Sequence, residues 1–263
     1  MGFTFNGQHT QDYGIYFTTS NIPLLPQMRT QEETVLGRDG VFIYENGYNN
    51  KTIELNCSFI GADTIHQRRQ VLRRVASWLR KEGELVFDNE PDKYYKGKIY
   101  NQIDLALFAS YDEFTLIFNS EPFAYSRWDN QELLQNMQGI EVDGKFIPYM
   151  QTKFTSISSN QTVTLSNLGN YEVSPVIELK GTADSVIISS GDKTFSISSI
   201  TGDTYIDCNN LIAYEVVADN KVNKLNDFEG EFIEFEEGLN EVSIEGTNLN
   251  LDSVHFIYRN RYL

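Results

Sequence analysis

Short segments in which polar and apolar residues alternate recur along the chain and constrain its fold more than any other feature. In residues 52–59, Ile53, Leu55 and Cys57 stand at every second position, which is the period of a half-buried β-strand. Residues 85–87 and 114–118 are shorter segments with the same strand-forming composition. These patterns predict a mainly β protein.

The second half of the chain strengthens this prediction. Turn residues such as Gly181 and Gly191-Asp192 separate the expected strands at short intervals, and no helical pattern comes between them. Strands are expected at residues 163–165, 175–179, 186–188, 195–197, 205–208, 242–244 and 254–262. Repeated short strands of this spacing are typical of a β-sandwich.

The segment Gly37-Arg38-Asp39-Gly40 predicts a hairpin within residues 28–48, because Asp-Gly pairs readily adopt the positive φ of tight turns. Extended segments are expected on both sides, at residues 34–36 and 41–44. Residues 41–44 are apolar at consecutive positions, so both faces of that strand need cover. An arm that docks on another subunit and an ordinary central hairpin both fit this pattern.

One amphipathic helix is expected at residues 64–82. Asp63 or Thr64 can cap its N-terminus, with Gln67 at capping-box distance from Thr64, and Gly83 is expected to end it as the C′ residue. The expected apolar face contains Ile65, Leu72, Val75, Ala76 and Leu79, and the remaining surface carries Arg68, Arg69, Arg73, Arg74, Arg80 and Lys81. Such a basic face is either solvated, part of a protein interface or a nucleic-acid surface, and the acidic chain favours the first two.

The length of 263 residues allows two hydrophobic cores. The strand pattern weakens after residues 122–126, where Gln- and Asn-rich sequence begins. We therefore expect an N-terminal domain at 1–130 and a C-terminal domain at 131–263, with residues 131–161 as a connecting region that holds a hairpin or loop of its own.

The formal charge of −16 argues against sequence-specific binding of nucleic acid, since that affinity comes mainly from basic side chains on phosphates. It is compatible with a surface past which DNA slides. Residues 1–7 lack the charged and apolar regions of a secretory signal, and no segment is apolar enough to span a membrane. We expect Cys57 and Cys208 to be free, buried thiols. No cofactor is expected, and no metal, because the three His residues are scattered.

A cluster of acidic residues, Glu231, Glu234, Glu236 and Glu237, raises the question of glycoside cleavage. That chemistry needs two carboxyl groups at a fixed separation across a cleft, one of them with a raised pKa. A dense acidic strand is more often a solvated face, and no nucleophile triad or phosphate-binding loop is present in the sequence. We therefore predict that the chain is not an enzyme.

A series of landmarks in a fixed order resembles the distal tail proteins, often called Dit, of long-tailed phages (siphoviruses) and prophages of Gram-positive bacteria. The series opens with Phe5-Asn6-Gly7 and Asp12-Tyr13-Gly14-Ile15, followed by Gly37-Arg38-Asp39-Gly40. It continues through residues 72–79, 83–91, 94–97, 121–126, 167–170, 174–177, 202–208, 235–240 and 258–263. Each landmark alone is weak, but their order over nearly the whole length makes the resemblance specific.

The resemblance implies an N-terminal β-sandwich with one helix and a hairpin arm, and a galectin-like C-terminal β-sandwich. It implies a hexameric ring at the tail tip or baseplate that joins the tail tube to the adsorption apparatus and lets DNA pass. The protein would be a structural part of the virion, assembled in the host cytoplasm. Its partners would be further copies of itself, the tail tube protein, a tail-tip protein and a receptor-binding protein. The residues of an intersubunit arm would be Val35, Leu36, Arg38, Asp39, Val41, Phe42, Ile43 and Tyr44.

Two roles remain open for the C-terminal domain. It could be a carbohydrate-binding module that contacts host cell-wall glycans, or a scaffold for neighbouring tail proteins. Sugars commonly stack on aromatic platforms, and both tryptophans, Trp78 and Trp128, precede this domain. The scaffold role is therefore the favoured hypothesis.

Overall fold

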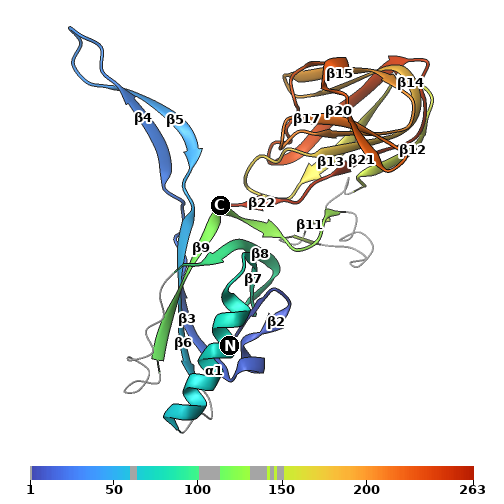
Figure 1. Ribbon diagram of the computed structural model, residues 1–263. Coiled ribbons are helices and arrows are strands. Elements are labelled where there is room, and N and C mark those ends of the chain that lie inside the picture. Colours follow the sequence, from blue (N-terminus) through green and yellow to red (C-terminus); the bar gives the residue numbers. More distant parts are fainter. Residues whose placement is uncertain (1, 60–63, 101–112, 131–140, 143–144, 147–150) are drawn as a thin grey trace. The chain divides into compact units, whose positions relative to one another are not determined.

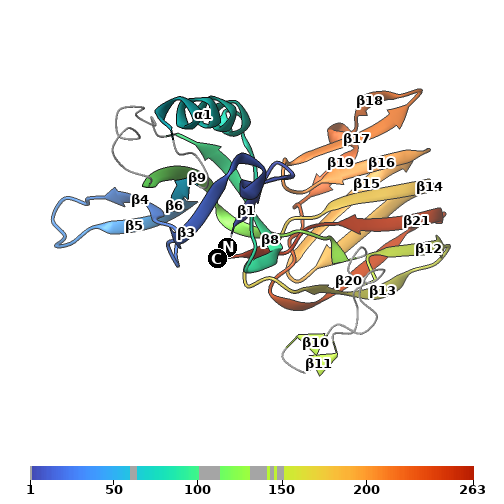
Figure 2. The same ribbon diagram turned by 90° about the horizontal axis from the view of Figure 1, so that it is seen from below.

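The computed structural model describes residues 2–59, 64–100, 113–130, 141–142, 145–146 and 151–263. The chain divides into two compact units, which we call the N-terminal unit (Met1–Arg127, with Leu263) and the C-terminal unit (Trp128–Tyr262). Strands dominate both units, as Figures 1 and 2 show, and the described residues contain a single α-helix. The predicted mainly β fold class is confirmed. Within these ranges no helix is both long and apolar enough to cross a bilayer.

The N-terminal unit is built on one antiparallel sheet with the strand order β2-β1-β7-β8-β9-β6-β3. A short 3-10 helix, η1 (Thr10–Tyr13), joins β2 to β3. The strands are β1 (Phe3–Phe5), β2 (Gln8–His9), β3 (Ile15–Asn21), β6 (Lys51–Phe59), β7 (Gly83–Phe87), β8 (Glu90–Ile99) and β9 (Glu113–Ser126).

This sheet curls around its own core. Phe3 of β1 and Phe17 of β3 lie near opposite ends of the strand order, yet their ring centroids are 5.7 Å apart in an edge-to-face contact. Phe5 of β1 contacts Phe118 of β9 in the same way, at 6.0 Å. All four rings are buried. The two halves of the sheet therefore face each other across a shared aromatic interior.

The helix α1 (Ile65–Leu79) covers this core. Thr64 and Gln67 form the predicted capping box: the Gln67 backbone N–H donates to Thr64 Oγ1 at 3.3 Å, and the Thr64 N–H donates to Gln67 Oε1 at 3.1 Å. Leu72, Val75, Trp78 and Leu79 are buried. Ala76 was expected on this face but is exposed, and Trp78 takes its place. Asp63, the alternative cap, lies outside the described residues.

The prediction for Gly83 was wrong. The helix ends at Leu79. Its C-cap residue, Arg80, has right-handed backbone angles (φ −70°, ψ −23°), and Gly83 is the first residue of β7. A Cβ atom at Gly83 would lie 2.0 Å from the side chain of Asn6, so a larger residue there would have to displace that side chain. Asn6 in turn accepts a hydrogen bond from the Glu84 N–H at 3.2 Å, which fixes the start of β7 beside β1.

The C-terminal unit consists of two sheets that share one strand. One sheet has the order β12-β21-β14-β16-β17-β18, and in the other β14 pairs with β15 and β20, which pair in turn with β19 and β13. The strands of these two sheets are β12 (Lys153–Ile157), β13 (Gln161–Asn167), β14 (Val176–Ser190), β15 (Lys193–Ile200), β16 (Asp203–Asp207), β17 (Ile212–Val217), β18 (Asn220–Asn223), β19 (Phe228–Gly230), β20 (Gly238–Thr247) and β21 (Asn250–Ile257). The unit also contains the 3-10 helix η3 (Leu225–Asp227) and the short strand β22 (Arg261–Tyr262).

The connecting region predicted at 131–161 is only partly described. The pair β10 (Glu141–Val142) and β11 (Lys145–Phe146) forms a small antiparallel ladder within it. The Gln- and Asn-rich residues 131–138 lie outside the described residues.

The strand β14 changes sheets at Gly181. Residues 176–182 pair with β16 and β21, whereas residues 183–190 pair with β15 and β20. Gly181 has a φ of +121° and stands at a bulge in the ladder with β21. Two separate strands with a turn at Gly181 were predicted, and this was wrong, because the glycine bends one continuous strand. A strand that passes through a bulge can belong to both layers of a sandwich.

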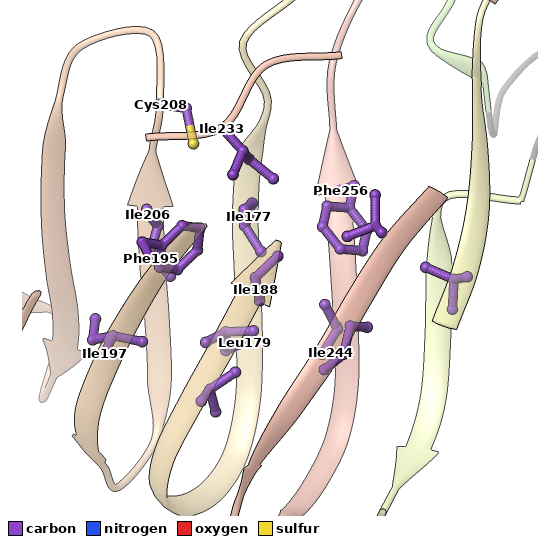
Figure 3. Packing of buried hydrophobic residues seen from close by; sticks show 14 of the residues in the cluster. Ile177, Leu179, Ile188, Phe195, Ile197, Ile206, Cys208, Ile233, Ile244 and Phe256 are labelled. Carbon is purple, nitrogen blue, oxygen red and sulfur yellow. The ribbon is translucent and has the colours of Figure 1, made fainter. Parts of the chain in front are cut away.

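The core of the C-terminal unit lies between these two sheets. Figure 3 shows Ile177 and Leu179 from the first half of β14 packing near Ile188 from its second half, beside Phe195 and Phe256. All five side chains are buried. The alternation predicted from the sequence thus places apolar residues of both layers in one continuous core.

Both cysteines are free and buried, as predicted. Cys57 lies on β6 in the N-terminal unit, and Cys208 follows β16 in the C-terminal unit. Burial raises the pKa of each thiol to about 12. The thiolate form is therefore scarce at neutral pH, and neither residue has the character of a reactive cysteine.

Candidate functional site

The strands β4 (Met28–Glu33) and β5 (Phe42–Tyr48) form a two-stranded ribbon that no other strand joins within the described residues. We call residues 28–48 the arm. In Figures 1 and 2 the arm extends away from the sheet of the N-terminal unit, beyond the ends of β3 and β6. Isolated two-stranded ribbons are marginally stable in water. The arm therefore lacks the cover that a ribbon normally needs.

The tip of the arm is wider than predicted. The strand β4 ends at Glu33, so residues 34–36, expected to be extended, belong to the loop. Gly37 and Gly40 both have left-handed backbone angles, with φ values of +86° and +85°. Two such glycines make a broad loop in place of a two-residue turn. The guanidinium of Arg38 lies 4.1 Å from the centroid of the Phe42 ring, which orders one side of this loop.

The arm exposes apolar side chains on both faces. Phe42 and Tyr44 point to one face of β5 and Ile43 to the other, because side chains alternate along a strand. The exposed fractions are 100% for Leu36, 59% for Ile43 and 50% for Tyr44. A contiguous apolar surface of this kind usually marks a site of association with another protein.

The base of the arm is fixed to the N-terminal unit. Tyr48, the last residue of β5, contacts the buried ring of Phe123 edge-to-face at a centroid distance of 5.9 Å. The Asn49 N–H donates to the Gln27 carbonyl at 2.7 Å, which closes the ladder below the last strand pair. The direction of the arm is therefore set by its base.

All eight residues proposed for the arm lie on this ribbon or in its tip loop. Val35, Leu36, Arg38, Asp39 and Val41 are in the loop, and Phe42, Ile43 and Tyr44 are in β5; every one of them is exposed.

Sequence reasoning missed Leu24 and Leu25, which lie between β3 and β4 and are 84% and 64% exposed. The signal was the segment Pro23-Leu24-Leu25-Pro26. A proline on each side excludes both leucines from a central strand, so they are held in irregular backbone at the base of the arm.

The acidic cluster forms part of a hollow on the C-terminal unit. Glu234 accepts hydrogen bonds from Lys193 Nζ and, at 3.5 Å, from Ser174 Oγ. Glu236 and Glu237, on the rim, are exposed to solvent. Among the described residues that line this hollow, Leu239 is the one large apolar side chain, so they form no apolar wall around a carboxyl group. Such a wall is what keeps a general acid protonated in glycosidases. No group of side chains suited to holding a metal ion occurs among the described residues.

The tyrosines on the outer face of the C-terminal unit do not form a sugar platform. Tyr205 and Tyr214 stack on each other with centroids 5.2 Å apart, and Lys221 Nζ lies 4.2 Å from the centroid of the Tyr214 ring. The Tyr205 hydroxyl donates to Glu178 at 2.7 Å. In the described part of this unit the large exposed apolar residues are all aliphatic: Leu211, Ile212, Val217, Val222, Leu225, Leu239 and Ile257. The carbohydrate-binding hypothesis gains no support from this arrangement.

Comparisons with known proteins point to phage tails. Residues 9–120 match the family described as phage tail protein RIFT-related domain. The structure of the whole chain is similar to the Dit protein (gp 19.1) of phage SPP1, with a TM-score of 0.67, 15% sequence identity and coverage of 100% of this chain and 99% of that one. No curated protein matches the sequence.

Two structures of the phage p2 baseplate in its activated conformation are also similar. The structure with Sr has a TM-score of 0.47 and 9% identity, covering 98% of this chain and 97% of the other. The structure with Ca has a TM-score of 0.44 and 9% identity, covering 95% and 91%.

The domain match and the SPP1 Dit similarity together confirm the resemblance to distal tail proteins that the sequence landmarks indicated. The match covers β3, the arm, β6, α1, β7 and β8 of the N-terminal unit. Residues 9–120 therefore match the phage tail protein RIFT-related domain, and the whole chain has a fold similar to that of the SPP1 Dit protein.

Proposed function

We propose that this chain is a structural component of a phage tail tip or baseplate, and that it assembles with copies of itself into a hexameric ring. The observation that carries the proposal is the exposed apolar arm on a phage tail domain. The SPP1 Dit protein is described as a paradigm of the hub adsorption apparatus in phages that infect Gram-positive bacteria. By analogy, the ring would join the tail tube to the adsorption apparatus.

The arm is the element we assign to the contact between neighbouring copies. Its two faces carry Phe42, Ile43 and Tyr44, so a partner must cover the ribbon on both sides. In a closed ring each copy gives its arm to one neighbour and receives the arm of another, which covers every arm with a single type of contact. Burial of these side chains would supply the apolar part of the interface energy.

The acidic chain suits a ring through which DNA passes. With a formal charge of −16, the surface repels phosphate over most of its extent, so a passing duplex would not adhere. The location that follows is the virion tail, assembled in the cytoplasm of the bacterial host. The tail tube protein and a tail-tip protein would bind the two sides of the ring.

The C-terminal unit is proposed to be a scaffold for neighbouring tail or receptor-binding proteins. Some of its exposed apolar residues gather on the edge strand β18 and its neighbour β17: Ile212 and Val217 on β17 and Val222 on β18 are between 44% and 50% exposed. An aliphatic sheet edge of this kind fits a protein contact better than a saccharide.

The test of assembly is multi-angle light scattering of the purified protein at several concentrations. We expect a discrete multimer of six copies from the native chain, and monomers from Leu36→Asp/Ile43→Asp. The matched control is Leu211→Asp/Leu239→Asp, which places the same charges at two residues of 58% exposure on the C-terminal unit. The assignment of the arm is refuted if both double variants assemble equally well.

The test of location is immunogold labelling of tailed particles that contain this chain. The gold should lie at the distal end of the tail. Labelling along the whole tail or at the capsid would refute a role at the tail tip.

A further inference from the structure

The solvent side of α1 carries a cluster of basic side chains. Arg69, Arg73 and Arg80 recur at spacings of four and seven residues, which places them on one stripe of the helix, opposite the buried face with Val75. Arg74 is also exposed on α1, and Lys81 follows Arg80 directly after the end of the helix. We call these five residues, Arg69, Arg73, Arg74, Arg80 and Lys81, the basic face. All five are exposed.

The basic face has no partner within the described residues, where none of its five side chains makes a hydrogen bond or an ion pair. Several other cations of the chain form ion pairs. Lys93 lies 3.1 Å from Glu90, Lys96 lies 3.0 Å from Glu121, and Lys224 lies 3.0 Å from Asp227. The contrast suggests that the partner of the basic face lies outside the chain that carries it.

The rest of the chain is acidic. The protein contains 21 Lys/Arg and 37 Asp/Glu, and residues 64–82 contribute six of the former and one of the latter, Glu82. Those residues therefore carry a formal charge of +5. The remainder has 15 basic and 36 acidic residues and a charge of −21. Outside residues 64–82, a second copy of the chain thus has 21 more acidic than basic side chains.

We infer that the basic face of one copy docks on an acidic surface of a second copy of this chain. Copies with a charge of −16 repel one another, and the helix is the place where that repulsion can be reversed. The inference rests on the proposed self-assembly and adds a contact of opposite character to the arm. The arm supplies apolar burial, and the basic face supplies orientation and a dependence on ionic strength.

The first experiment is carbodiimide cross-linking, which joins a lysine amine directly to a carboxylate. A mixture of unlabelled and nitrogen-15-labelled chains is cross-linked at about 20 mM and at about 500 mM salt, between which the screening length falls severalfold. We expect mixed-isotope peptides that join Lys81 to an Asp or Glu of another copy at low salt, and their loss at high salt. Cross-links of Lys81 confined to one isotope would overturn the inference.

The second experiment measures self-association by sedimentation velocity. Arg69→Glu/Arg73→Glu should raise the dissociation constant roughly tenfold or more, because two attractions become repulsions at an interface. The control Lys98→Glu/Lys221→Glu makes the same change of net charge at two exposed lysines elsewhere. It should change the dissociation constant by less than about twofold. Circular dichroism checks that each variant is folded.

The outcomes separate this inference from the proposed function. If Leu36→Asp/Ile43→Asp abolishes assembly while Arg69→Glu/Arg73→Glu has no effect, the proposed function stands and the basic face has no role in self-contact. A native chain that stays monomeric and gives no mixed-isotope cross-links refutes both. Retention of a short DNA duplex by the native chain but not by Arg69→Glu/Arg73→Glu, with assembly unchanged, would identify nucleic acid as the partner and refute a second copy.

Discussion

Replacement of Gly181 by alanine should selectively destabilise the C-terminal unit. A Cβ atom at this position would lie 2.5 Å from the Asn250 carbonyl oxygen and 2.8 Å from the Leu251 Cα. Both are backbone atoms, so no side-chain rotation can relieve the clash. The φ of +121° is also one that residues with a side chain rarely adopt.

The expected magnitude follows from these two contributions. Backbone strain at such a φ costs about 1–3 kcal/mol, and forced overpacking costs a further ~1–3 kcal/mol. Alanine also restricts the unfolded chain more than glycine does, which stabilises the folded state by about 0.4–1 kcal/mol and offsets part of this cost. Gly181→Ala should therefore lower the free energy of unfolding by about 3 kcal/mol, within a range of about 1–6 kcal/mol, and the central value shifts a urea midpoint by roughly 1–2 M.

The two cysteines provide the assay. Each thiol is buried and has its pKa raised to about 12, so alkylation requires unfolding of the unit that contains it. In a urea titration read by peptide mass spectrometry, the labelling midpoint of Cys208 should fall in Gly181→Ala. The midpoint of Cys57, in the N-terminal unit, should not move.

Gly191→Ala is the matched control. Gly191 also has a positive φ, of +60°, but a Cβ there would meet nothing within 4 Å. Its effect should stay within about 1 kcal/mol, because strain at the left-handed position is largely offset by the gain in the unfolded chain. Equal shifts of Cys208 labelling in the two alanine variants would refute the explanation of Gly181 by backbone contact.

Three further predictions concern stability. Asn130→Ala should destabilise the C-terminal unit by about 1–3 kcal/mol in urea denaturation, because it removes two buried hydrogen bonds, one that the Asn130 amide donates to the Ser166 carbonyl at 2.6 Å and one that it accepts from Asn260 at 2.8 Å; a change below 0.5 kcal/mol would contradict this. Trp78→Phe should cost the N-terminal unit about 1–3 kcal/mol, measured by the labelling midpoint of Cys57, because the Nε1–H bond to the Phe5 carbonyl at 2.8 Å is lost; an unchanged midpoint would count against that bond. Burial favours the neutral form of Glu178, but hydrogen bonds from Tyr205 and Lys180 outweigh it and hold the pKa of this carboxyl below its usual value. The charged group therefore stabilises the fold above its unfolded pKa and loses that contribution as pH falls through the lowered one, so Glu178→Gln should cost more stability at pH 7 than at pH 3.

Local features of the fold were readable from the sequence. The capping box of Thr64 and Gln67 involves residues three positions apart, so its geometry is set by the helix itself. The alternation of Ile53, Leu55 and Cys57 likewise fixes which face of β6 is buried. These signals depend on neighbours in the chain, and that is why sequence alone predicts them.

Features that depend on distant residues were not readable. A glycine such as Gly181 fits a turn as well as a bulge, and only its pairing with β21 decides between them. The role of Gly83 depends on Asn6, which is far away in the sequence. At the arm, the apolar residues 41–44 showed that both faces need cover, but a sequence does not state whether the cover comes from the same chain.

The sharing of β14 between two sheets has a mechanical consequence. A sandwich held together only by side-chain packing can slide or separate layer from layer under load. Here a continuous backbone runs from one layer into the other, so a pull on either layer is transmitted through covalent bonds. In the proposed ring, such a strand would add stiffness to each copy without any added contact area.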